Sequence, residues 1–161
     1  MLLVVPVYLE PKFIGLDSSG ARIRPDAQVY FPSESFSIDG SVTHPASPYY
    51  SVQGSKSSLA AAKLRESLKH KKYDDQAAKE KSKFIPFVME TFGGFGKEAR
   101  LLIKKISKLH SDLATVPTRQ NARTSLISRT LSILLQRGNA LIQLTGAQFA
   151  REAAGAQCGY N

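Results

Sequence analysis

Apolar and polar residues alternate along two neighbouring segments, PDAQVYF (25–31) and SFSIDGSVTH (35–44). A period of two is typical of half-buried strands. The earlier apolar segment LLVVPVYL (2–9) predicts a further strand, and IGLDSSGARI (14–23) predicts a turn region because Gly and Ser cluster there. The N-terminal half should therefore form short strands.

The C-terminal half has the spacing of helices. After the breaker-rich segment HPASPYYSVQGS, a helix is predicted over about residues 57–80, which are dense in Ala, Leu, Lys and Arg. Further amphipathic helices are predicted over 97–113 and about 119–145, the latter weakened at Gly138, with a short helix and disorder in the tail from residue 146. The residues expected to face inward are Ala99, Leu102, Ile103, Ile106, Leu109 and Leu113, then Leu126, Ile127, Leu131, Leu134, Leu141 and Ile142.

Between these helices lies KFIPFVMETF, an almost continuous apolar run that predicts a strand covered on both faces, with Pro86 at a strand end or bulge. Strands, a crossover helix, another strand and two packing helices predict an α/β (α+β) fold with a mixed sheet. We expect a core over residues 1–115 and a C-terminal helical extension over 116–161 packed on it, within a single domain overall. Fold class alone implies no activity.

The charge balance is strongly basic, with 22 Lys and Arg against 13 Asp and Glu and a net charge of +9. It favours a polyanionic partner, nucleic acid before an acidic membrane, although a basic but uninvolved surface would have the same composition. No apolar run reaches the roughly 20 residues of a membrane span. A single cysteine, Cys158, excludes a disulfide framework and a cysteine zinc site, and it fits a reducing compartment. The expected location is intracellular, and nuclear if the source is eukaryotic.

Two aspartates, Asp26 and Asp39, are expected to meet across a hairpin. If the turn is centred between Pro32 and Ser33, opposed residues have numbers that sum to 65, which places the two aspartates directly opposite each other. Alternation makes their face polar and the other face apolar. The polar face holds Gln28, Tyr30, Ser35, Ser37, Ser41 and Thr43, and the apolar face holds Ala27, Val29, Phe31, Phe36, Ile38 and Val42.

Opposed side chains have Cβ atoms about 5 Å apart, and two carboxylates that close repel each other unless a cation or a proton lies between them. Mg²⁺ or Mn²⁺ would meet that need, and it would also lower the pKa of a bound water and stabilise charge on a phosphodiester. The alternative is that both aspartates cap turns on a solvated sheet face.

The order Arg24-Pro25-Asp26, twelve residues, then Asp39-Gly40-Ser41 resembles the Pro-Asp and (Asp/Glu)-x-Lys core of PD-(D/E)XK nucleases. It is most similar to the restriction-like endonuclease domain at the end of some non-LTR retrotransposon proteins. The downstream Val-Thr-His-Pro, the Lys-rich helix ending in Lys72-Tyr73 and the segment FIPFVMETFGGFGKEA extend the likeness over about residues 22–110. Such domains tend to have a helix before the first strand, and this sequence begins too close to that strand to include one. A fragment of a longer polyprotein, or an inactive remnant, would lack the helix in the same way.

The resemblance implies that Asp26 and Asp39 bind the metal and that a lysine positions or activates the water. Ser41 stands where that lysine is expected, so Lys69 or Lys72 from the following helix could replace it. Helical spacing places Glu66, Lys69 and Tyr73 on one face, opposite Leu64 and Leu68. Glu10 and Glu90 are further carboxylates, and Glu90 is the candidate third metal ligand because it ends an apolar strand.

The expected function is metal-dependent DNA nicking, in partnership with a reverse transcriptase domain of the same polyprotein. The residues expected to contact nucleic acid are Arg24, Lys56, Lys63, Lys71 and Tyr73. No small-molecule cofactor is expected, and Gly93-Gly94-Phe95-Gly96 lacks the Lys-Ser/Thr pair of a nucleotide-binding loop. No membrane partner is expected either, since no apolar run is long enough to span a bilayer. The alternative is a catalytically inactive nucleic-acid-binding remnant of the same fold.

Overall fold

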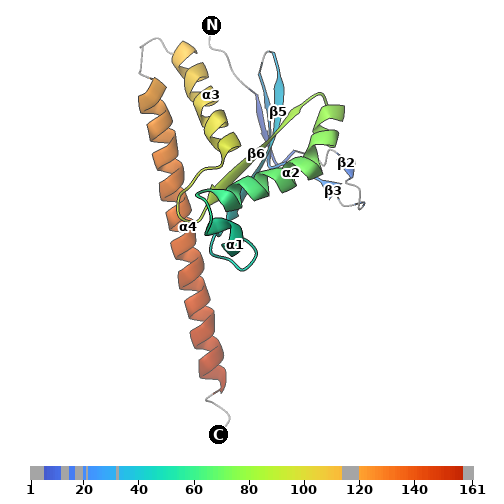
Figure 1. Cartoon of the computed structure of the whole chain (residues 1–161). Coiled ribbons are helices and arrows are strands. Elements are labelled where there is room, and N and C mark those ends of the chain that lie inside the picture. Colours follow the sequence, from blue (N-terminus) through green and yellow to red (C-terminus); the bar gives the residue numbers. More distant parts are fainter. Residues whose placement is uncertain are drawn as a thin grey trace.

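The computed structural model describes residues 6–11, 15–16, 20, 22–31, 33–113 and 120–157, with side chains left undescribed at 110–113, 120 and 152–157. It shows a mixed α/β architecture built on a four-stranded mixed sheet, with helices around it (Figure 1). The strand order is β1 (Val7–Leu9), β4 (Ala27–Tyr30), β5 (Ser35–Thr43) and β6 (Lys83–Glu90). Two short strands, β2 (Gly15–Leu16) and β3 (Arg22–Ile23), pair separately, where only a turn region was expected.

The hairpin of β4 and β5 has the register that side-chain alternation predicts. Its antiparallel pairs run from Ala27 opposite Ile38 to Tyr30 opposite Ser35, so every pair sums to 65. The expected polar face is not solvated, however, because Ser37, Asp39 and Thr43 are all buried. The polar face of β5 is therefore covered, whereas Val42 of the expected apolar face is 53% exposed.

The crossover from β5 to β6 contains α1 (Ser51–Gly54), which was not predicted, and α2 (Ala60–Lys79), which was. Because β5 and β6 are parallel, the chain must return along the sheet, and α2 provides that return. On one sheet face, Phe84 of β6 stacks on Tyr73 of α2 at 4.7 Å between ring centroids. Together with Ile23 and Ala77 these two rings form a buried core cluster.

Pro86 lies in the middle of β6, opposite Asp39, and not at a strand end or bulge as predicted. The physical reason is that β6 is an edge strand of the sheet, so the missing N–H removes no ladder hydrogen bond on the outer side. The expectation that β6 is covered on both faces is confirmed, because α2 and α3 (Lys97–Leu113) both pack against it. On the α3 side, the Lys105 Nζ lies 4.6 Å from the centroid of the Phe36 ring.

Helix α3 has the predicted bounds, and Ala99, Leu102 and Ile103 are buried as expected. Ile106 is 41% exposed, Leu109 is half-buried, and the side chain of Leu113 lies outside the described residues.

Helix α4 (Gln120–Gln157) is one continuous helix through Gly138, longer than predicted (Figure 1). Ile127 and Leu131 are half-buried, and Leu135 is buried. The remaining side chains predicted to face inward are exposed, and the C-terminal part of α4 extends past the sheet and α3 (Figure 1). They are Leu126, Leu134, Leu141 and Ile142.

Candidate functional site

The two aspartates lie at one point of the hairpin. Asp26 immediately precedes β4 and continues its register, so it lies opposite Asp39 of β5. Asp26 is exposed, and its Oδ2 accepts a hydrogen bond of 2.6 Å from the backbone N–H of Gly40. Asp39 is only 7% exposed and points beneath α2. One carboxylate therefore opens to solvent while the other lies inside.

Helix α2 brings a lysine and a tyrosine onto Asp39. The Lys69 ammonium forms an ion pair with Asp39 Oδ2 and donates a hydrogen bond of 3.2 Å to the carbonyl oxygen of Gly40. The Tyr73 hydroxyl donates to Asp39 Oδ1 at 3.1 Å. Lys69 and Tyr73 share a face because residues four apart lie one turn apart on a helix. This face, and not the Leu64 and Leu68 side, is the buried face of α2.

Among the two candidate lysines, the structure brings only Lys69 to the aspartates. Lys72 is exposed and lies over the outside of the Tyr73 ring, 5.4 Å from its centroid. The Ser41 side chain, where the nuclease pattern expects lysine, has a buried hydroxyl oxygen with no hydrogen-bond partner among the residues that the structure describes. The positive charge that strand β5 lacks is thus delivered from the crossover helix.

Burial lowers the pKa of Lys69, because removal from water destabilises the ammonium form. The nearby charge of Asp26 acts in the opposite direction, and Lys72 adds to the lowering. Lys69 therefore gives up its proton more easily than an ordinary surface lysine.

The aspartates have partners within the protein that reduce their mutual repulsion. Lys69 is the cation beside Asp39, and Asp26 bonds to the backbone of Gly40 instead of facing a bare carboxylate. Within the described part of the chain, no group of three or more His, Cys, Asp or Glu side chains could hold a metal ion. The donors available at the site are the carboxylates of Asp26 and Asp39 and the carbonyl of Gly40. One or two carboxylates with waters and a substrate phosphate are the usual ligands of Mg²⁺, so this set fits that ion.

Glu90, the expected third metal ligand, lies apart from the aspartates. It pairs with Thr43, four positions beyond Asp39 along β5, which is about 13 Å at the rise of a strand. Its Oε1 accepts a hydrogen bond of 3.1 Å from the backbone N–H of Ala62, in the first turn of α2. A carboxylate at a helix N-terminus satisfies an unpaired donor and complements the helix dipole, which explains how Glu90 is accommodated.

Glu66 is a buried carboxylate to which the sequence assigned no role. It is 7% exposed, and its Oε1 accepts a hydrogen bond of 3.0 Å from the backbone N–H of Glu98 at the start of α3. Burial raises the pKa of Glu66. The signal available in the sequence was its place on the same helical face as Lys69 and Tyr73.

The residues expected to contact nucleic acid divide into two groups. Lys56, Lys63 and Lys71 are exposed, and Arg24 is exposed beside Glu10, with 2.8 Å between Nη2 and Oε2. Tyr73 differs from that expectation: it is 7% exposed, and its ring stacks on Phe84 of the sheet. Its hydroxyl orients Asp39 and does not face a ligand outside the protein.

No family model, curated protein or solved structure matches the chain. Among the described residues, no helix is both long and apolar enough to cross a bilayer.

Proposed function

We propose that this chain is a metal-dependent DNA endonuclease domain with a restriction-endonuclease-like fold. The observation that carries the proposal is the ion pair of Lys69 and Asp39 beside Asp26. A lysine and two aspartates are the residue types that the nuclease pattern requires. Here the lysine reaches the second aspartate from a helix, although the strand has Ser41 in its place.

The energetics of this pair favour a functional role over a structural one. Taking a lysine and an aspartate out of water costs several kcal/mol per ion, and apolar residues of similar volume are often equally stabilising. A buried ion pair is therefore weak support for stability. Titratable groups that are buried beside a specific charge partner cluster at functional sites. The exposed Asp26 next to them gives the cluster a side that opens to solvent.

The proposed chemistry assigns one task to each residue. Asp26 and Asp39 would hold Mg²⁺ or Mn²⁺, which when bound supplies a water of lowered pKa and offsets charge on the scissile phosphate. Lys69 would position the attacking water through its ammonium, which forms an ion pair with the Asp39 carboxylate beside the proposed metal. Tyr73 keeps the Asp39 carboxylate in one orientation.

The basic surface would supply DNA affinity, since 22 Lys and Arg residues give a net charge of +9. In a retroelement, such a domain would nick the target and provide the primer end for a reverse transcriptase of the same polyprotein. The second candidate is an inactive DNA-binding remnant of this fold. It is favoured by the closure of Asp39, which is fully engaged by Lys69 and Tyr73.

Nicking of supercoiled plasmid in Mg²⁺ by wild type, Asp26→Ala and Asp75→Ala tests the proposal. Asp75 is an exposed aspartate of α2 and serves as the matched control. Asp26→Ala should lower nicking by orders of magnitude, because a metal ligand is lost, while DNA affinity stays equal or rises slightly. Equal nicking by wild type and Asp26→Ala would overturn the site, and DNA binding without nicking by wild type would establish the second candidate.

A further inference from the structure

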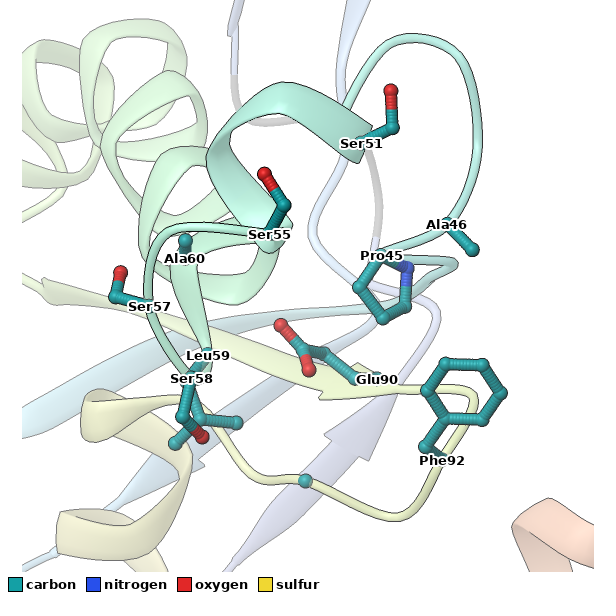
Figure 2. Close-up of a pocket in the computed structure, with 12 residues that line it drawn as sticks. Pro45, Ala46, Ser51, Ser55, Ser57, Ser58, Leu59, Ala60, Glu90 and Phe92 are labelled. Atoms are coloured by element: carbon teal, nitrogen blue, oxygen red, sulfur yellow. The ribbon is translucent and has the colours of Figure 1, made fainter.

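A separate hollow lies where α2 begins and β6 ends, on the sheet face that Asp39 shares (Figure 2). Its volume is about 590 Å³, within the range of small-molecule pockets. Glu90 lies at its inner side, Phe92 at its rim, and Ser57, Ser58 and Leu59 border it from the segment before α2. The hollow is distinct from the aspartate site, because Asp26, Asp39 and Lys69 do not line it.

Glu90 directs an acceptor into this hollow (Figure 2). The residue is 7% exposed, and its Oε1 accepts from Ala62, but its Oε2 makes no hydrogen bond to any described residue. Gly94 keeps the space in front of the carboxylate clear. A Cβ there would lie 2.5 Å from the Leu59 Cδ2 and 3.5 Å from the Glu90 Oε2. A carboxylate oxygen that borders a hollow and is free of protein partners can accept a hydrogen bond from a ligand bound there.

An aromatic ring is held at the rim. Phe92 is 72% exposed, and its ring packs edge to face against the His44 ring at 5.4 Å between centroids. The Nδ1 of His44 is in turn 2.8 Å from the Thr91 hydroxyl, so the ring beneath Phe92 is itself anchored. An exposed, supported aromatic ring is a platform on which a flat ligand can stack.

We propose that the hollow binds the Watson–Crick edge of an unpaired guanine. Guanine is the base that presents two adjacent donors, N1–H and N2–H, to a carboxylate. Adenine and cytosine place an acceptor beside their amino group, and that acceptor would face the lone pairs of Glu90. The hydroxyls of Ser57 and Ser58 and the first-turn N–H of Ala60 border the same hollow and can donate to the O6 of guanine.

The ligand must be a base outside a duplex. Pairing hides the Watson–Crick edge, so only a single-stranded or extruded guanine can present it to a pocket. The choice of DNA as the source of this guanine rests on the proposed function. Glu90 and Asp39 lie on the same sheet face, and Thr43, the partner of Glu90, is about 13 Å from Asp39 along β5. A guanine held here would fix the strand a few nucleotides from the aspartates.

The test is binding of the full chain to labelled single-stranded oligonucleotides in EDTA, where hydrolysis cannot contribute. The strands are thymidine tracts that contain one central dG, deoxyinosine, dA or dC. Glu90→Gln keeps an oxygen for the N–H of Ala62 but presents an amide donor to the hollow. Glu80→Gln, an exposed carboxylate just beyond α2, is the matched control, and thermal melting of each variant checks folding.

Wild type and Glu80→Gln should bind the dG strand on the order of tenfold more tightly than the dA or dC strand, with deoxyinosine between them. Glu90→Gln should lose this preference, and Phe92→Ala should weaken all strands by a similar factor. If free 5′-GMP competes with the dG strand, the nucleotide alone is enough for binding. If wild type prefers guanine but 5′-GMP does not compete, the hollow binds guanine only as part of a strand. Absence of guanine preference in wild type, or its persistence in folded Glu90→Gln, would overturn the inference. Because binding is measured without cleavage, failure of the nuclease proposal leaves this result readable.

Discussion

Replacing Asp39 with Asn should destabilise the protein strongly, although the two side chains have nearly the same shape. Asn can still accept the Tyr73 hydrogen bond through its Oδ1. It carries no charge, so the Lys69 ammonium, whose residue is 6% exposed, would be left with the Gly40 carbonyl as its hydrogen-bond partner. Removal of one member of a buried ion pair leaves an uncompensated charge and costs about 3–5 kcal/mol.

The upper limit follows from the proton equilibrium of Lys69. The variant can escape the buried charge by releasing the proton, and at pH 7 this costs about 5 kcal/mol from an ordinary pKa of 10.5, at about 1.36 kcal/mol per pH unit. The loss of free energy of unfolding should therefore lie between about 3 and 5 kcal/mol. This loss of stability should become smaller as the pH rises toward 10.5. A lysine whose pKa is lowered in the folded state destabilises the fold only at pH values where the same lysine is protonated in the unfolded chain.

Urea unfolding followed by far-UV circular dichroism measures this loss in wild type, Asp39→Asn, Lys69→Met and the double variant. Removal of both charges should recover most of the stability, so the two single effects should be non-additive by at least about 2 kcal/mol. Asp75→Asn, an exposed change on the same helix, should shift stability by less than about 0.5 kcal/mol. A loss below about 1 kcal/mol for Asp39→Asn, or additive single effects, would refute the buried ion pair.

Two further predictions concern neighbouring residues of α2. Glu66→Gln keeps an acceptor for the N–H of Glu98 and removes a buried acid whose pKa is raised. The stability of wild type relative to this variant should therefore fall as the pH rises from about 4.5 through the folded pKa. A difference in urea midpoint that stays constant across that range would contradict the prediction. In the plasmid nicking assay, Lys69→Met should lower turnover at saturating DNA. Lys72→Met, a change at an exposed residue, should mainly raise the half-saturating DNA concentration. The reverse pattern would assign the catalytic role to Lys72.

The hairpin and the helical faces could be predicted because they depend on local periodicity. Alternation in β4 and β5 sets which residues are opposed, and one apolar face is enough to exclude a register shifted by one residue. The grouping of Glu66, Lys69 and Tyr73 follows in the same way from helical spacing. These two patterns, taken together, placed Asp39 and Lys69 each on a definite face.

The burial of those faces could not be predicted. A polar face reads as solvated, yet Asp39 and Lys69 are buried together because each neutralises the other, and the two lie 30 positions apart in sequence. The caps of Glu66 on α3 and Glu90 on α2 likewise join residues 32 and 28 positions apart. Sequence spacing carries no information on such partners.

The delivery of Lys69 by the crossover helix also bears on the order in which the molecule can assemble. The hairpin of β4 and β5 contains both aspartates but no lysine, so formed alone it would hold Asp26 beside a bare Asp39 carboxylate. The carboxylate becomes buried only when α2 packs on the sheet. That step costs the entropy of closing a long loop before the stabilising contacts form. The ion pair can thus form only in chains in which α2 has packed on the sheet. Comparing the refolding rates of wild type and Lys69→Met would therefore report on that packing step.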